Sequence, residues 1–291
     1  MAVQTTASVA QPYVPGRGRS AVARRTLIYA VLIAVALVFF IPFLWSVITS
    51  FKTIPDSVNV TGLPHPWTTS AWHDLWVNYD FPTYIENSVF LAAVVVSCNL
   101  FLSGLGGYAF ARLRFPGREL LFLLVLGTLM VPDQLRLIPI FEMIVSWGLF
   151  GSFWGYIMIN LVSATNLFFM RQYFSTIPKD FEEAAKLDGA GYFKTFWRVM
   201  LPLALPAISA LVILQFQGTW NDFFWPLILF GQGNPDHYTI QLGLQVLHTQ
   251  YTTLWPQIMA GSVIAILPIV VIFLAFQRYF VSGVVTAGVK G

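Results

Sequence analysis

The stretch EEAAKLDGAG, residues 182–191, carries two glutamates, a lysine and an aspartate in a 291-residue chain that is 57% hydrophobic and 10% charged. Ordinary soluble domains are roughly 25% charged, so the composition predicts a protein built of several membrane spans. Each charged group at the centre of a bilayer costs roughly 2.5–3.5 kcal/mol. The charged segment 180–188 therefore stays in water or against another protein.

The same stretch predicts a short helix. Asp180 is placed to cap its amino end, with Glu183 in the capping-box relation, and Gly189 is placed to end it in a left-handed conformation. A helix of about two turns is marginal alone in water. Ala184 and Ala185 leave a low surface that another backbone can approach. The residues alone leave two interpretations open, a docking helix for a cytoplasmic partner and a solvated helix with no partner.

Long apolar runs surround this segment, and a helix of about 20 apolar residues crosses a bilayer. The first run exceeds the length of a signal-peptide core and is followed by no small-residue cleavage site, so it is predicted to be retained. The sequence predicts an all-α integral membrane protein with six transmembrane helices. The predicted spans cover residues 26–51, 87–110, 120–141, 152–174, 203–230 and 257–280.

The basic residues orient these spans, because lysine and arginine in short loops favour the cytoplasm. The amino tail, the loop after the second span, the charged loop and the carboxyl tail hold every lysine and arginine except Lys52 and Arg136. Both termini and the charged loop are therefore predicted to be cytoplasmic, in a multi-pass protein of the cell membrane.

The first outer loop contains SAWHDLW, residues 70–76, which predicts a short helix at the membrane interface or against a partner. Its Trp72, Leu75 and Trp76 share one helical face. His65 and His73 in the same loop have no third ligand at metal-site spacing, so surface histidines are the favoured interpretation. The single cysteine excludes a disulfide scaffold.

Residues 183–202, EAAKLDGAGYFKTFWRVMLP, resemble the EAA loop of binding-protein-dependent ABC importer permeases. That pattern is Glu-Ala-Ala, three residues, Gly, nine residues and Ile-x-Leu-Pro, and Val199 stands here for its isoleucine. Matching residues, which the resemblance makes the ATPase-coupling site, are Glu183, Ala184, Ala185, Gly189, Leu201 and Pro202. The segments VPDQLRLIP (131–139), WNDFFWPLIL (220–229) and QRYFVSGVVTAGVKG (277–291) are similar to the carbohydrate branch, particularly the maltose-type second permease subunit.

The resemblance implies a type I, MetI-like permease fold with a cytoplasmic coupling helix. Its implied partners are a second, related permease subunit, two cytoplasmic ATPases, an extracytoplasmic binding protein and a sugar cargo. ATP and magnesium would be bound by the ATPases and no cofactor by this chain, which would be a transporter subunit and not an enzyme. The implied division is a cytoplasmic tail (1–25), a first transmembrane helix (26–51), an extracytoplasmic loop (52–85), a permease domain (86–280, with the EAA loop at 179–202) and a cytoplasmic tail (281–291). Lys290 in that last tail is a further candidate contact to the ATPases.

Polar side chains inside the predicted spans mark a second candidate site, because such groups usually face a cavity or a partner. Amides beside aromatic rings suit the hydroxyls and apolar faces of a sugar. The substrate-path candidates are Asn160, Asn166, Gln215, Trp220, Asn221 and Asp222. Hydrogen bonding between helices is the competing interpretation for each of them. Asp133 and Arg136 likewise form an internal ion pair or offer a contact to an anionic cargo.

Other functions remain open beside sugar import. The same machinery could carry glycerol 3-phosphate or another polyol phosphate, but an anionic cargo favours basic groups and the spans offer only Arg136. A stand-alone secondary transporter would commonly show inverted repeats, and the charged loop would have no purpose in it. A membrane enzyme would need a catalytic constellation that the sequence lacks, and the glycine-rich phosphate loop of ATPases is also absent from it.

Overall fold

The computed structural model describes the backbone of residues 19–59, 62–231, 234–248 and 253–288. Within these ranges the fold is helical, with no strand beyond one isolated bridge between His248 and Thr253. In chain order the elements are α1 (Arg19–Thr49), α2 (Ile54–Ser57), α3 (Ser70–Val77), α4 (Phe81–Arg112), α5 (Arg118–Thr128), the 3-10 turn η1 (Asp133–Arg136), α6 (Leu137–Ser146), α7 (Phe153–Asn160), α8 (Ala164–Thr176), α9 (Asp180–Leu187), α10 (Tyr192–Thr195), the π-helical turn η2 (Phe196–Met200), α11 (Leu201–Leu203), α12 (Leu205–Trp220), α13 (Phe224–Phe230), the 3-10 turn η3 (Pro235–His237), α14 (Ile240–Val246) and α15 (Trp255–Gly288).

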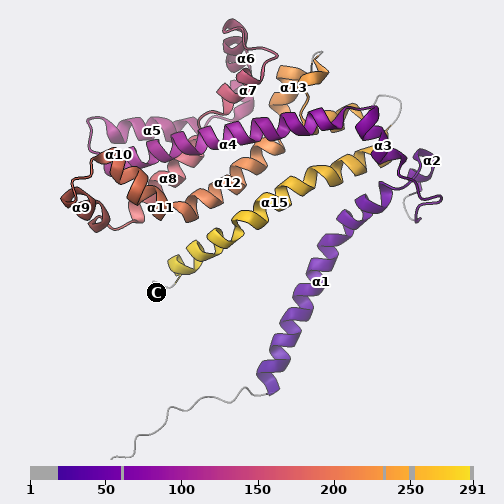
Figure 1. The fold of residues 1–291 in the computed structure, drawn as a ribbon, viewed down its shortest axis with the longest axis horizontal. Helices are drawn as coiled ribbons and strands as arrows, with labels where there is room; N and C mark the ends of the chain where they lie inside the picture. Colours follow the sequence, from indigo (N-terminus) through magenta and orange to yellow (C-terminus); the bar gives the residue numbers. More distant parts are fainter. Residues whose placement is uncertain (1–18, 60–61, 232–233, 249–252, 289–291) are drawn as a thin grey trace, which may run out of the picture.

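A bundle of α4, α8, α12 and α15 forms the centre of the molecule, with extensive contacts between α4 and α8 and between α12 and α15 (Figure 1). The short helices α9, α10 and α11 lie at one end of this bundle, and α2 and α3 lie at the other. Helix α1 contacts α15 near its own carboxyl end and then diverges from the rest. The charged loop thus lies at the opposite end of the bundle from the first outer loop.

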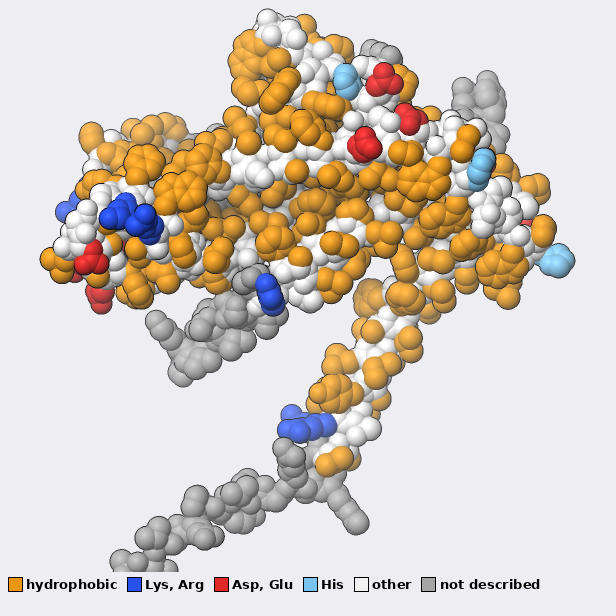
Figure 2. Space-filling model, in the orientation of Figure 1, with side chains coloured by type: hydrophobic (Ala, Val, Ile, Leu, Met, Phe, Trp, Pro, Cys, Tyr) orange, Lys and Arg blue, Asp and Glu red, His pale blue; other side chains and the backbone are white. Residues whose placement is uncertain are grey.

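Three helices among the described residues are long and apolar enough to cross a membrane: Val22–Thr49, Phe81–Arg112 and Trp255–Arg278. Two bent helix pairs raise the number to five if each pair makes one span. The predicted all-α membrane architecture is therefore present, but the six predicted spans are not confirmed. Figure 2 shows a broad hydrophobic surface over the bundle, as expected of a protein surrounded by lipid.

The predicted third span, 120–141, is wrong as a continuous helix. Helix α5 ends at Thr128 and is only 11 residues long, shorter than a bilayer requires. Pro132 explains the break, because proline lacks an amide hydrogen and pushes the preceding residue away from helical geometry. The chain resumes as η1 and α6 beyond this proline.

The predicted fourth and fifth spans are interrupted. Helices α7 and α8 form a pair bent by 42°, and the Ser163 hydroxyl caps α8 by accepting from the Asn166 amide at 3.2 Å. The predicted run 203–230 divides into α12 and α13, where Asp222 accepts from the Trp225 amide at 3.3 Å. Small polar residues that bond to the backbone favour helix ends over helix interiors, which accounts for both breaks.

Two element boundaries also differ from expectation. Helix α4 begins at Phe81, before the predicted start of the second span. Helix α15 continues to Gly288, so most of the predicted tail 281–291 is helical, whereas Lys290 lies outside the described residues.

The short helix predicted in the outer loop is confirmed as α3, and it packs against its own chain. Ala71 and Leu75 are fully buried against the bundle. The Trp72 indole donates to the Ser50 hydroxyl at 3.2 Å, and the Gln257 amide donates to Asp74 at 3.1 Å. These contacts fix the outer loop to the ends of α1 and α15.

Candidate coupling loop and central cavity

The charged loop helix α9 begins differently from the predicted capping box. Lys179 is the capping residue and makes no side-chain capping bond, while Asp180 is already the first residue of the helix. Asp180, Glu182 and Glu183 all lie in the first turn, where carboxylates interact favourably with the positive end of the helix dipole. Charge at the helix terminus therefore stabilises α9 in place of a hydroxyl or carboxylate cap.

The carboxyl end of α9 is as predicted. Gly189 has φ of 74°, the left-handed region that favours glycine. The Ala190 amide donates to the Ala185 carbonyl at 2.9 Å, and the Gly189 amide donates to the Lys186 carbonyl at 3.0 Å. This pair of bonds is a Schellman motif, which closes the helix and turns the chain back toward the bundle.

The two alanines of α9 face different surroundings, contrary to the prediction that both leave an open surface. Ala185 is buried against the chain itself, whereas Ala184 and Glu183 are exposed. Leu187 is 89% exposed and Phe193, just beyond the turn, is 75% exposed. Sequence reasoning missed these two apolar side chains, although their position in a charged loop predicted to be cytoplasmic was a usable signal.

Arg112 fixes α9 to the bundle. Its Nε lies 3.7 Å from Glu182 Oε1, and its Nη2 donates to the main-chain carbonyls of Phe174 and Ile177 at the end of α8. Sequence reasoning treated Arg112 only as a marker of orientation. Beneath the loop lies an apolar cluster from α4, α8 and the segment after α9, which includes Tyr108, Phe174, Phe196 and Met200.

Leu201 and Pro202, the last residues of the predicted coupling pattern, lie at a sharp bend. The helical segments Tyr192–Leu203 and Leu205–Trp220 meet there at 75°. The Ala204 amide bonds to the carbonyls of Met200 and Leu201 at 3.0 and 3.1 Å. The pattern therefore extends from the exposed helix α9 to the point where the chain enters the bundle.

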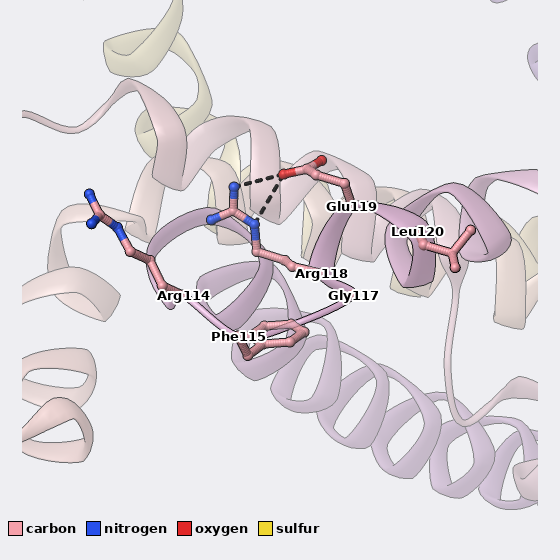
Figure 3. A pocket seen from close by; sticks show the side chains of 6 residues that line it. All are labelled: Arg114, Phe115, Gly117, Arg118, Glu119 and Leu120. Carbon is pink, nitrogen blue, oxygen red and sulfur yellow. Dashed lines mark hydrogen bonds and ion pairs between the residues drawn. The ribbon is translucent and has the colours of Figure 1, made fainter.

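The turn between α4 and α5 lies at the same end of the bundle and carries three charged groups (Figure 3). Arg118 donates to Glu119 Oε1 at 2.7 and 3.0 Å, and Arg171 of α8 donates to Glu119 Oε2 at 3.0 Å. Hydrogen bonding from Arg118, aided by the charge of Arg171, lowers the pKa of Glu119 below its ordinary value. The pair between Arg171 and Glu119 connects α8 to the start of α5.

A polar cavity of about 420 Å³ lies in the middle of the fold, between the helix breaks described above. Asn160 and Gln215, two of the predicted substrate-path residues, line it together with Asn99, Arg136 and Trp225. This cavity combines amide groups, one guanidinium and one aromatic ring, which is a set able to bind hydroxyl-rich molecules.

Asn166 lies behind the cavity wall and organises it. Its amide nitrogen donates to Asn99 Oδ1 and to Gln215 Oε1, both at 2.7 Å. Asn99 in turn donates to the Asn160 carbonyl at 3.1 Å. These bonds join α4, α7, α8 and α12, so Asn166 has the interhelical role that was the competing interpretation.

The remaining predicted path residues do not line this cavity. Trp220 is buried in the helix core and donates to the Ala265 carbonyl at 2.9 Å. Asn221 is exposed and accepts from Gln241 at 3.2 Å. Asp222 accepts from the Tyr156 hydroxyl at 3.0 Å. The side chain of Asp133 lies outside the described residues, so its predicted pairing with Arg136 stays a prediction.

No group of three potential metal ligands occurs among the residues that the structure describes. His65 and His73 accordingly gain no third ligand within these ranges.

Discontinuous membrane helices around a polar cavity are typical of membrane transport proteins. The chain belongs to the binding-protein-dependent transport system inner membrane component family, whose model matches residues 102–286. The resemblance read from residues 183–202 is thereby confirmed at the level of the family. It is a transporter permease component with no indicated catalytic function of its own.

Curated relatives support this placement over most of the chain. The arabinooligosaccharides transport system permease protein AraQ of Halalkalibacterium halodurans is 39% identical over 209 residues, covering 72% of this chain and 74% of the relative. AraQ of Bacillus subtilis is 40% identical over 205 residues, covering 70% of this chain and 72% of the relative. The sn-glycerol-3-phosphate transport system permease protein UgpE of Yersinia pestis is 33% identical over 226 residues, covering 76% of this chain and 80% of the relative.

Among solved structures, a chain of a bacterial ABC transporter involved in the import of the acidic polysaccharide alginate superposes with a TM-score of 0.77. The two sequences are 24% identical, and the match covers 92% of this chain and all of that chain. This similarity establishes the MetI-like permease fold.

Proposed function

We propose that this chain is the membrane permease subunit of an ATP-driven importer that moves a sugar, as a mono- or oligosaccharide, across the cytoplasmic membrane. In this proposal α9 docks in a separate cytoplasmic ATPase through Glu183, Ala184 and Gly189. A second permease subunit, two ATPases and an extracytoplasmic binding protein complete the transporter. ATP and magnesium bind to the ATPases, and both termini of this chain lie in the cytoplasm.

The exposed face of α9 is the observation that carries this proposal. A two-turn helix with exposed Leu187 and Phe193 beside it presents apolar surface in a region too charged for lipid. Apolar surface rimmed by charges is typical of a protein interface. Family membership supplies the kind of partner, and the Schellman turn at Gly189 supplies a defined shape for docking.

The cargo is inferred from the central cavity. Asn160 and Gln215 offer amide donors and acceptors there, and Trp225 offers an aromatic face. The two AraQ relatives, which transport arabinooligosaccharides by name, support an oligosaccharide. These features favour a neutral sugar held by hydrogen bonds and ring contacts.

Uptake measurements test the function. Deletion of the gene in its native host should abolish uptake of labelled arabino-oligosaccharides, and the wild-type gene should restore it. A tag on the restored protein should capture a second permease and an ATPase from detergent extracts. Normal uptake of the labelled arabino-oligosaccharides in the deletion strain would refute that particular cargo, and capture without any ATPase would refute the mechanism.

Glycerol 3-phosphate is the second candidate cargo, because Arg136 lines the cavity and UgpE is a relative. A guanidinium is well suited to bind phosphate. The same deletion strain distinguishes the two candidates: loss of labelled glycerol 3-phosphate uptake with normal oligosaccharide uptake would favour the phosphate.

A further inference from the structure

The ion pair between Arg112 and Glu182 joins a membrane-spanning helix to the exposed loop helix. Arg112 lies in the last turn of α4, and Glu182 lies in the first turn of α9. The two side chains are 6% and 12% exposed, and their charged atoms are 3.7 Å apart. A pair this enclosed is screened by salt far less than an exposed pair.

The same guanidinium reaches a third helix. Arg112 Nη2 donates to the carbonyls of Phe174 and Ile177, which lie at and just after the carboxyl end of α8. A cation is favoured there because the helix dipole places negative charge at that end. One side chain therefore connects α4, α8 and α9.

Glu182 differs from the other acidic residues around α9. Asp180, Glu183 and Asp188 are all exposed and available to a partner. Glu182 instead turns inward, so its charge is used within the chain. Ala185, which is 6% exposed, is the one buried residue of α9, and the helix otherwise contacts η2 and α10.

The apolar cluster beneath the loop cannot replace this attachment. Contacts such as those of Phe196 and Met200 are apolar, and hydrophobic burial is non-directional. A helix resting on such a surface can shift with little loss of contact. The Arg112 guanidinium is held by hydrogen bonds to two main-chain carbonyls, and its charge attracts Glu182 across 3.7 Å, an interaction between α9 and α4 that apolar contact does not supply.

We infer that Arg112 is the positioning residue that transmits displacement of α9 to α4 and α8. This inference rests on the proposed function, in which an ATPase moves α9. A pull on α9 acts through Glu182 on the guanidinium, and through it on the ends of two helices that line or organise the cavity. Without the pair, α9 would move over the bundle and the helices would lag behind.

A thiol-labelling experiment tests this inference without knowledge of the cargo. Complexes are captured from native membranes through a tag on this chain, in a Cys98→Ser background that carries Thr128→Cys. Thr128 lines the central cavity. The rate at which a maleimide modifies the introduced thiol is compared with and without ATP plus vanadate, which gives an ATP response for each variant.

With Arg112 and Glu182 both intact, the maleimide labelling rates with and without ATP plus vanadate should differ clearly. Glu182→Gln, which conserves side-chain shape, and Arg112→Gln should each reduce the ATP response by about five-fold or more, the lower range of measured couplings between sites. Arg112→Lys keeps a positive charge beside Glu182 and should retain more of the response than Arg112→Gln. Glu86→Gln, which makes the same substitution at an exposed carboxylate near the start of α4, is the matched control and should respond like the wild type.

Each outcome decides between defined alternatives. A full ATP response in both Glu182→Gln and Arg112→Gln overturns the inference while leaving the proposed function intact. A lower yield of complex with an unchanged response per complex also overturns it, because the pair would then serve stability alone. Absence of any response in the wild-type pair overturns ATPase coupling itself, and this inference with it.

Discussion

Gly107 of α4 faces Met170 of α8 with no room for a side chain between them. A β-carbon on Gly107 would lie 2.5 Å from the β-carbon of Met170 and 2.8 Å from the amide nitrogen of Arg171. The helices approach this closely because one of them lacks a side chain at the crossing, as is common in helix pairs within membranes. This crossing sets the spacing of the two helices that Arg112 connects.

Substitution of this glycine should therefore destabilise the protein. Gly107→Ala is expected to cost about 1–3 kcal/mol, because the added carbon meets backbone as well as a side chain. Thermal unfolding of the purified protein in detergent measures the loss. Gly218→Ala in α12 is the matched control, since its added carbon meets nothing within 4 Å, and an equal melting temperature for the two variants would contradict the expectation.

Substitutions at Gly189 should distinguish the effect of backbone strain from the effect of docking to the ATPase. A β-carbon there meets nothing within 4 Å, so Gly189→Ala suffers only from the positive φ, at a cost of roughly 1–2 kcal/mol. Gly189→Trp carries similar strain and adds bulk on the exposed side. Gly189→Trp is expected to uncouple transport from ATP hydrolysis at normal abundance. Gly189→Asn, which tolerates the left-handed conformation, should couple well, and normal transport by Gly189→Trp would refute the coupling role.

The exposed apolar side chains predict a second effect at the same surface. Leu187→Asp should reduce the amount of ATPase that co-purifies with this chain, because a charge would replace an apolar contact at the proposed interface. Val58→Asp is the control, since Val58 is 74% exposed at the opposite end of the molecule. Equal ATPase recovery with both variants would remove Leu187 from the interface.

The cavity predicts a difference between two amides. Gln215→Leu should slow uptake and lower stability, because it removes a polar group from the cavity and one partner from buried Asn166, at about 1–3 kcal/mol. Asn221→Leu should change uptake less, because Asn221 does not line the cavity. Uptake and ATPase activity measured together check both, and the reverse order of effects would exclude Gln215 from the path.

The cluster around Glu119 predicts a pH dependence. Its pKa is lowered from 4.5 in the folded protein, so its contribution to stability is present above pH 4.5 and is lost as the pH falls through the folded pKa. Glu119→Gln should accordingly lower the melting temperature near pH 7 and lose this deficit at low pH. Melting curves of both proteins across this range provide the check, and a deficit that grows on acidification would contradict the assignment.

The sequence predicted the features that depend on local chemistry. The all-α membrane class follows from composition, and the end of α9 follows from glycine's access to positive φ. The spans predicted from hydropathy alone were wrong as continuous helices over 120–141, 152–174 and 203–230. Apolar content does not reveal that Pro132, Ser163 and Asp222 lie at breaks within the apolar runs, since proline acts through backbone geometry and the other two through bonds to main-chain amides.

The side-chain contacts within the candidate sites could not be predicted from the sequence. Arg112 and Glu182 are 70 residues apart in the chain, and no periodicity relates them. Asn166 was recognised as polar within an apolar run, but its bonds to Asn99 and Gln215 depend on how three helices cross. Tertiary pairs of this kind follow from packing and not from spacing along the chain.

Helix α1 has a consequence for the space that the subunit occupies. Its candidate span, Val22–Thr49, has 28 residues with Arg24 and Arg25 near the start, and no residue of its most apolar window is buried within the chain. At 1.5 Å per residue it extends about 42 Å, whereas the hydrocarbon layer is about 30 Å thick. A helix longer than the hydrocarbon layer is accommodated by tilting, by local thickening of the bilayer, or by end residues such as Arg24 and Arg25 reaching the interface. Because α1 diverges from the bundle, the subunit occupies a larger area of the membrane than the bundle alone.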